Sequence, residues 1–176
     1  MWFFLIWYCN GVFNISGGEI YSYQTRVIEN SGVMNISSGK IYGTRTDASG
    51  AGSNNLIDNT STGELYITGG EITFIGQGAV INNTNRVEIT NTKVDLYRLY
   101  TTGWYSHTLY TNFINNSSSN SYAKITGGTY GETNTMGRLI TNQGTAIIEN
   151  VTSNFRTGVY NTGTITKGYA DTAIKK

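Results

Sequence analysis

Apolar and polar positions alternate in short stretches that recur along the whole chain. In each stretch, apolar residues stand at the second and fourth positions, and the position between them is mostly polar. This period of two is typical of a β-strand with one buried face. The fourth position reads Ile15, Ile36, Ile67, Ile89, Ile125 and Ile148, and then Lys167. No stretch shows a sustained helical period, so the pattern predicts a series of similar strands.

A second strand signal follows the first in each unit. It is an apolar pair, as in Leu56-Ile57 or, in the last unit, Val159-Tyr160. Each pair precedes an asparagine: Asn30, Asn59, Asn83, Asn116, Asn142 and Asn161. Because asparagine tolerates left-handed backbone, we expect these residues to form corners.

Short strands and corners in units of about 20 residues predict a solenoid. The expected fold is all-β, a single-stranded right-handed parallel β-helix of about six to seven coils with loop insertions at corners; right-handed winding is the default for parallel crossovers. Equivalent residues should stack, and the column after the first corner would then alternate in charge through Glu19, Lys40, Glu71 and Lys93.

The chain divides into three predicted segments. Residues 1–10 are an apolar first strand or N-terminal cap, residues 11–168 are the parallel β-helix, and residues 169–176 are a C-terminal tail or cap. The apolar start, residues 1–8, is too short to span a bilayer and lacks the basic start of a signal peptide. We therefore predict no transmembrane segment.

Two insertions interrupt the repeat. Residues 43–55 are rich in glycine, serine and asparagine and predict a flexible loop. Residues 95–111 are aromatic instead, and loops on a rigid scaffold are where binding tends to reside. The candidate binding residues are therefore Tyr97, Tyr100, Trp104, Tyr105, His107 and Tyr110.

The repeat resembles those of known solenoid proteins. Residues 15–20 (ISGGEI) with residues 28–32 (IENSG) are similar to the right-handed parallel β-helix repeats of bacterial surface proteins, adhesin-like and autotransporter-like. The same coil also resembles pectin-lyase-type enzymes and phage tail proteins. The resemblance implies a cell-surface or extracellular location.

Composition narrows the range of chemistry. A net charge of +1 with 13% charged residues offers no basic stripe for nucleic acid. The chain has one cysteine, Cys9, and one histidine, His107. We therefore expect neither a metal site built from Cys or His ligands nor a Cys–His nucleophile. No cofactor is predicted.

Only one pair of acids suggests catalysis. Glu29 and Asp58 follow equivalent isoleucines in successive units, so they are expected to stack, and two carboxylates about 5 Å apart suit glycoside chemistry or Ca²⁺. Neutral residues, Asn82, Asn115 and Thr141, fill the same column elsewhere. The pair is a weak candidate, and no catalytic or metal-binding residue is assigned beyond it.

Two functions follow. The first is a non-enzymatic extracellular module, a stalk or adhesin segment that binds a glycan or a host or partner protein through its corner loops. The second is a polysaccharide-processing lyase or hydrolase, or a phage tail-type protein. The oligomeric state stays open, as does whether the chain is one segment of a longer solenoid.

Overall fold

The computed structural model describes seven stretches of the chain: residues 7–23, 28–44, 55–76, 78–97, 111–133, 137–155 and 158–168. Within these stretches every regular element is a β-strand, and the strands form two large sheets whose paired strands run parallel. The predicted all-β class is confirmed. Parallel sheets of this size are compatible with a β-solenoid.

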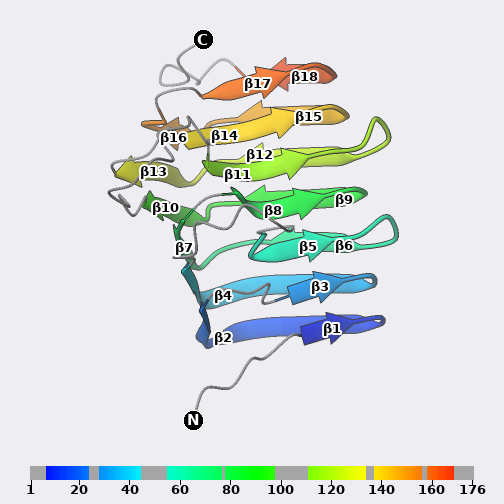
Figure 1. Ribbon diagram of the computed structural model, residues 1–176, viewed down its shortest axis with the longest axis vertical. Helices are drawn as coiled ribbons and strands as arrows, with labels where there is room; N and C mark the ends of the chain where they lie inside the picture. The colour runs from blue at the N-terminus through cyan, green and yellow to red at the C-terminus, as the bar shows by residue number, and fades with distance from the viewer. Residues whose placement is uncertain are drawn as a thin grey trace, which may run out of the picture.

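The smaller sheet, face 1, takes one short strand from each unit. Its seven strands, in spatial order, are β1 (Trp7–Cys9), β3 (Ile28–Asn30), β5 (Ile57–Asn59), β8 (Gly78–Asn83), β11 (Thr111–Asn116), β14 (Gly137–Asn142) and β17 (Val159–Asn161). This order is also the order along the chain, so each strand lies between its counterparts from the preceding and following units (Figure 1).

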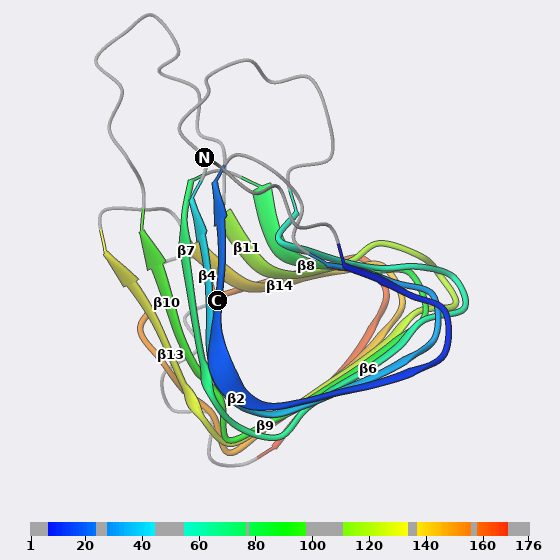
Figure 2. The same cartoon turned by 90° about the horizontal axis from the view of Figure 1, so that it is seen from below.

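The larger sheet has eleven strands and bends into two faces. Strands β2 (Val12–Tyr23) and β4 (Val33–Thr44) run through the bend and belong to both. Face 2 also holds β6 (Glu64–Ile67), β9 (Arg86–Thr90), β12 (Tyr122–Thr126), β15 (Thr145–Glu149) and β18 (Thr164–Lys167). Face 3 also holds β7 (Glu71–Ile75), β10 (Lys93–Tyr97), β13 (Thr129–Thr133) and β16 (Thr152–Ser153). Seen along the stack, the three faces enclose a roughly triangular interior (Figure 2).

The predicted register is confirmed in face 2. Ile36 pairs with Ile67, Ile67 pairs with Ile89, and the column continues through Ile125 and Ile148 to Lys167. The side chains of Ile67, Ile89, Ile125 and Ile148 are completely buried. Burying each contributes roughly 1.5–3 kcal/mol, so these columns are a main source of stability.

The alternating charges also stack as predicted. Glu19 pairs with Lys40, Lys40 with Glu71, and Glu71 with Lys93 along face 3. The Lys93 ammonium lies 3.7 Å from Glu71 Oε1. Because both side chains are about half exposed, solvent screens the pair and it contributes little to stability.

Asparagines form a hydrogen-bonded ladder where face 1 turns into face 2. Five of them are completely buried: Asn30, Asn59, Asn83, Asn116 and Asn142. Each side-chain nitrogen donates to the side-chain oxygen of the asparagine in the next unit, at 2.6–2.8 Å, and the last acceptor is Asn161. Each nitrogen also donates to backbone carbonyls of the turn. The buried amide nitrogens of the ladder are thus all hydrogen-bonded, as buried polar groups require.

These asparagines form corners, as predicted, but none of them has left-handed backbone. Among the described non-glycine residues, positive φ occurs at Asn91 (52°) and Asn150 (54°), which lie at the bend between faces 2 and 3. At the equivalent bend, Gly70 has φ of 86°, and a Cβ there would stand 2.7 Å from the Gly39 carbonyl oxygen. The bend between faces 2 and 3 therefore uses left-handed backbone. The turn from face 1 to face 2 uses the amide side chain of asparagine instead.

Three boundaries differ from the sequence prediction. A third face, formed by β7, β10, β13, β16 and the ends of β2 and β4, adds to the two strands per unit that the sequence predicts. Gly43 and Thr44 belong to β4, and residues 95–97 belong to β10, so both insertions begin later than predicted. In the last unit, Val159 and not Tyr160 pairs with Ile140, which leaves Tyr160 on the outer surface.

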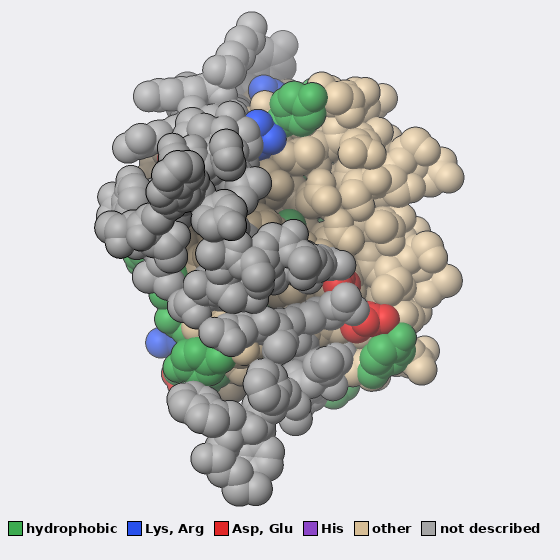
Figure 3. Space-filling view, in the orientation of Figure 1, with side chains coloured by type: hydrophobic (Ala, Val, Ile, Leu, Met, Phe, Trp, Pro, Cys, Tyr) green, Lys and Arg blue, Asp and Glu red, His purple; other side chains and the backbone are tan. Residues whose placement is uncertain are grey.

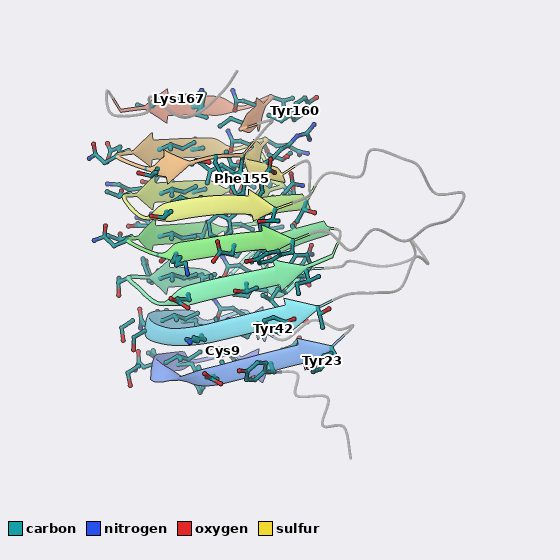
Figure 4. The ribbon with its side chains drawn as sticks, turned by 90° about the vertical axis from the view of Figure 1, so that its left-hand side faces the viewer. Cys9, Tyr23, Tyr42, Phe155, Tyr160 and Lys167 are labelled. Carbon is teal, nitrogen blue, oxygen red and sulfur yellow. The ribbon has the colours of Figure 1, made fainter. Side chains whose placement is uncertain are left out.

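At the first unit, Cys9 takes the place of the asparagine. It pairs with Asn30, is buried, and its thiol lies 3.4 Å from the Gly11 carbonyl and 3.8 Å from the Val33 carbonyl. Figure 4 shows Cys9 near the lower end of the stack. The Cys9 thiol is therefore buried in the column that asparagine occupies in the other units. Residues 1–6 and the predicted tail, residues 169–176, lie outside the described stretches.

Candidate functional site

The acid pair stacks as the sequence predicts. Glu29 and Asp58 are direct partners on β3 and β5, on the outer side of face 1. Asp58 is 8% exposed and accepts a hydrogen bond from Asn55 Nδ2 at 2.6 Å, while Glu29 is half-buried. Acidic side chains are visible on the lower right of face 1 in Figure 3. The two carboxylates are therefore neighbours, and Asp58 is already engaged by the scaffold.

The acid column does not continue upward. The next positions are Asn82 and Asn115, whose side-chain amides bond to each other at 3.0 Å. Among the described residues, no group of three or more His, Cys, Asp or Glu side chains is placed to hold a metal ion. The described part of this column thus contains two carboxylates followed by two amides.

Of the predicted aromatic binding residues, only Tyr97 is described. It is the last residue of β10, on face 3, and its side chain is 37% exposed. Tyr100, Trp104, Tyr105, His107 and Tyr110 lie outside the described residues. Tyr97 thus stands where the chain leaves the sheet and enters the predicted binding segment.

Face 3 carries further exposed tyrosines that the sequence prediction missed. Tyr21 (55% exposed) pairs with the half-buried Tyr42, and Tyr23 (52% exposed) stands two residues along β2. Figure 4 shows Tyr23 and Tyr42 at the lower end of this face. The missed signal is the alternation Ile20-Tyr21-Ser22-Tyr23, which continues the period of two past the Gly-Gly corner.

The rings of Tyr21 and Tyr42 are neighbours. Their centroids are 5.7 Å apart and their planes are tilted by 48°. The Tyr21 hydroxyl donates to Glu19 Oε2 at 2.5 Å, and this hydrogen bond raises the pKa of Tyr21 above its ordinary value. The hydrogen bond restrains the exposed ring of Tyr21 while leaving its face open to solvent.

Polar groups continue the same outer column above the tyrosines. Tyr42 pairs with Thr73, Thr73 with Asp95, and Asp95 with Gly131. Asn154 follows next, since Tyr130 pairs with Ser153. We call this series the central outer column of face 3: Tyr21, Tyr42, Thr73, Asp95, Gly131 and Asn154.

The upper part of this column contains a gap between two oxygen atoms. A Cβ at Gly131 would lie 3.2 Å from Asp95 Oδ1 and 3.8 Å from Asn154 Oδ1. Because glycine has no side chain, the space between these two oxygens stays open. Lys93 Nζ lies 3.4 Å from Asp95 Oδ2. Asp95, and then Glu71, raise the pKa of Lys93. Asp95 therefore keeps Oδ1 directed along the column while Oδ2 faces a cation.

Comparisons with known proteins give no relative from which a role could be transferred. No protein-family model, curated protein or solved structure matches the chain. In the stretches that the structure describes, no helix is long and apolar enough to cross a membrane.

Proposed function

We propose that the chain is a non-enzymatic, extracellular module, a stalk or adhesin segment of a bacterial surface, that binds a glycan or a partner protein. We further propose that its coils, about six to seven, wind as a right-handed parallel β-helix. Parallel strands joined in sequence favour that hand. Extended display is a property of solenoids, because each unit contacts only its neighbours.

The observation that carries this proposal is the exposed aromatic side chains on a rigid scaffold. Tyr21, Tyr23 and Tyr97 are all more than a third exposed, yet their strands rest on buried isoleucine columns. Tyrosine gives large contact area with a polar group at low entropic cost. Tyr97 also connects this surface to the aromatic segment that was predicted to bind.

One observation favours the enzyme alternative, the stacking of Glu29 on Asp58. Glycoside hydrolysis needs two carboxylates at a fixed separation, and general-acid chemistry needs one of them protonated. The two positions that follow Asp58 in this column are the amides Asn82 and Asn115, which supply no further acid or base. Binding without turnover is therefore the better-supported function.

Two assays on the same preparation distinguish these functions. We expect the protein to bind immobilised glycans and to release no reducing ends or unsaturated uronates from polysaccharides. Turnover that is lost in both Glu29→Gln and Asp58→Asn, with folding retained, would establish the enzyme instead. Absence of binding to glycans and of turnover would contradict glycan recognition.

A further inference from the structure

We infer that face 3 binds an uncharged, linear oligosaccharide that lies along the central outer column, with Tyr21 and Tyr42 stacking on sugar rings and Asp95 and Asn154 accepting hydrogen bonds from sugar hydroxyls. This inference rests on the proposed binding function and assigns it to a sheet face in place of the corner segment. Four properties of face 3 indicate this ligand.

The first property is the aromatic platform. Tyr21 and Tyr42 lie on adjacent strands with their ring centroids 5.7 Å apart, and Tyr21 is 55% exposed. The C–H face of a pyranose ring packs on an aromatic ring, because both surfaces are flat and apolar while the sugar's hydroxyls stay at the edge. The hydrogen bond from Tyr21 to Glu19 restrains one ring before the ligand arrives, which lowers the entropic cost of binding.

The second property is the direction of the column. Five of its members come from successive strands at one register position, and Asn154 directly follows β16, so they line up across the strands at steps of about 4.8 Å. One step is close to the length of one sugar unit in an extended chain. A linear oligosaccharide lying along the stack can therefore meet one protein group per sugar.

The third property is the change of chemistry along the column. The lower positions are aromatic, and the upper ones carry oxygen atoms of Thr73, Asp95 and Asn154. Asn154 Oδ1 already accepts the Glu132 backbone N–H at 2.9 Å and keeps its second lone pair for a ligand hydroxyl. Gly131 removes the side chain between Asp95 and Asn154, so a ligand can approach the backbone there. The column thus combines aromatic rings for stacking with oxygen atoms that bind hydroxyl groups. A sugar uses both kinds of group, whereas an apolar protein segment would use only the aromatic rings.

The fourth property is charge. The column beside the tyrosines alternates as Glu19, Lys40, Glu71 and Lys93, so its formal charges cancel. Asp95 is the one carboxylate within the central outer column, and it pairs with the same Lys93, so the two columns together carry one net negative charge. Such a surface gives no long-range attraction to a polyanion. The ligand should therefore be a neutral oligosaccharide and not a polyuronate.

A direct test compares matched tyrosine substitutions. The full chain, Tyr21→Ala/Tyr42→Ala and Tyr160→Ala would be applied to an array of linear hexasaccharides that includes cellohexaose, xylohexaose, mannohexaose and hexagalacturonate. Tyr160 is the control, because it is similarly exposed (51%) but lies on face 1. Circular dichroism and thermal unfolding would establish that each variant is folded.

We expect the parent chain and Tyr160→Ala to bind at least one neutral hexasaccharide equally, and the double variant to bind it about tenfold more weakly or worse. Asp95→Asn, which keeps the side-chain shape, should also weaken binding. Full binding by a folded double variant would overturn the assignment to face 3 while leaving the proposed function standing. Binding to hexagalacturonate alone would overturn the neutral ligand. Absence of binding to every member of the array would overturn the inference. A dimer of the parent chain that the double substitution abolishes would also overturn it, and would identify face 3 as a contact between copies.

Discussion

The side chain of Asn116 links three units of the chain at once. Its nitrogen donates to Asn142 Oδ1 at 2.6 Å, and its oxygen accepts from Asn83 Nδ2 at 2.7 Å. It also donates to carbonyls of its own turn and of the next. Removing one such group leaves buried partners unpaired, which costs more than the bonds themselves contribute.

We therefore expect Asn116→Ala to lower the free energy of unfolding by about 3 kcal/mol or more, from lost hydrogen bonds and unpaired buried groups. Asn115→Ala is the matched control, since Asn115 is the preceding residue, half-buried, with one side-chain bond to Asn82. It should lose no more than about 1 kcal/mol. Urea unfolding measures both values. If the free energy of unfolding fell equally in the two variants, the buried ladder would contribute no more than the single hydrogen bond of Asn115.

Tyr130 is the opposite case, a buried polar group without a partner. Its side chain is 1% exposed, its ring packs 5.3 Å from that of Phe113, and its hydroxyl makes no hydrogen bond in the structure. Burial raises the pKa of Tyr130 far above its ordinary value. The folded state therefore holds the phenolic proton at pH values where the unfolded chain releases it.

This pKa shift predicts a pH-dependent difference between the parent chain and Tyr130→Phe. Near neutral pH the variant should be as stable as the parent or more stable, because it removes an unpaired hydroxyl. Above pH about 10 the unfolded tyrosine ionises and the parent should lose about 1.4 kcal/mol per pH unit through this group. Phenylalanine avoids that loss, so the stability difference should grow in favour of the variant. A variant that is clearly less stable at neutral pH would reveal a hydrogen-bond partner for the hydroxyl.

At the scale of strands, burial follows the period of two. In β9 and β12, Val87, Ile89, Ala123 and Ile125 are completely buried, whereas the residues between them face outward. The columns at positions two and four were predictable for this reason: alternation, corner and spacing all point to the same register. The final Lys167 was also placed correctly, because it breaks the isoleucine column in sequence as it does in space.

A charge in this column should be costly. Ile67→Asp places an unpaired carboxylate in the dry interior, and we expect it to reduce stability by several kcal/mol, about 4 kcal/mol or more. Thr68→Asp is the control, since Thr68 is the next residue and is exposed. That variant should unfold within about 0.5 kcal/mol of the parent. Similar denaturation midpoints for both variants would mean that Ile67 is not buried.

Other strand features could not be deduced from the alternation. The inward-facing positions of the face 3 strands hold different residue types in different units. They are Ile41 and Gly43 in β4 but Tyr130 and Glu132 in β13. Tyrosine also serves both sides, because Tyr130 is buried and Tyr21 is exposed. The asparagines were predicted correctly as corner residues, but the ladder that joins them was not predicted, because it needs the neighbouring unit, which sequence spacing alone does not display. For the candidate site, the stacking of Glu29 on Asp58 was predicted, whereas the tyrosine surface of face 3 was not.

At the scale of the whole molecule, the fold is a stack in which each unit rests on the next (Figure 1). Nearly all strand pairing joins residues about 20 or more positions apart, and the same outer columns run through all units. A stack of this kind converts a one-dimensional repeat into long, straight surfaces. The proposed oligosaccharide surface depends on that geometry, because its six positions come from six successive units.

The distance between spin labels at two ends of one outer column tests this stacking most directly. Asn14 and Thr166 are exposed and are separated by six steps of one column, through Asn35, Tyr66, Glu88, Lys124 and Ile147. With Cys9 replaced by alanine and cysteines introduced at Asn14 and Thr166, we predict a single narrow distribution centred near 29 Å, from steps of about 4.8 Å. A broad distribution, or a centre below about 20 Å or above about 40 Å, would contradict the stack of units on which the whole account depends.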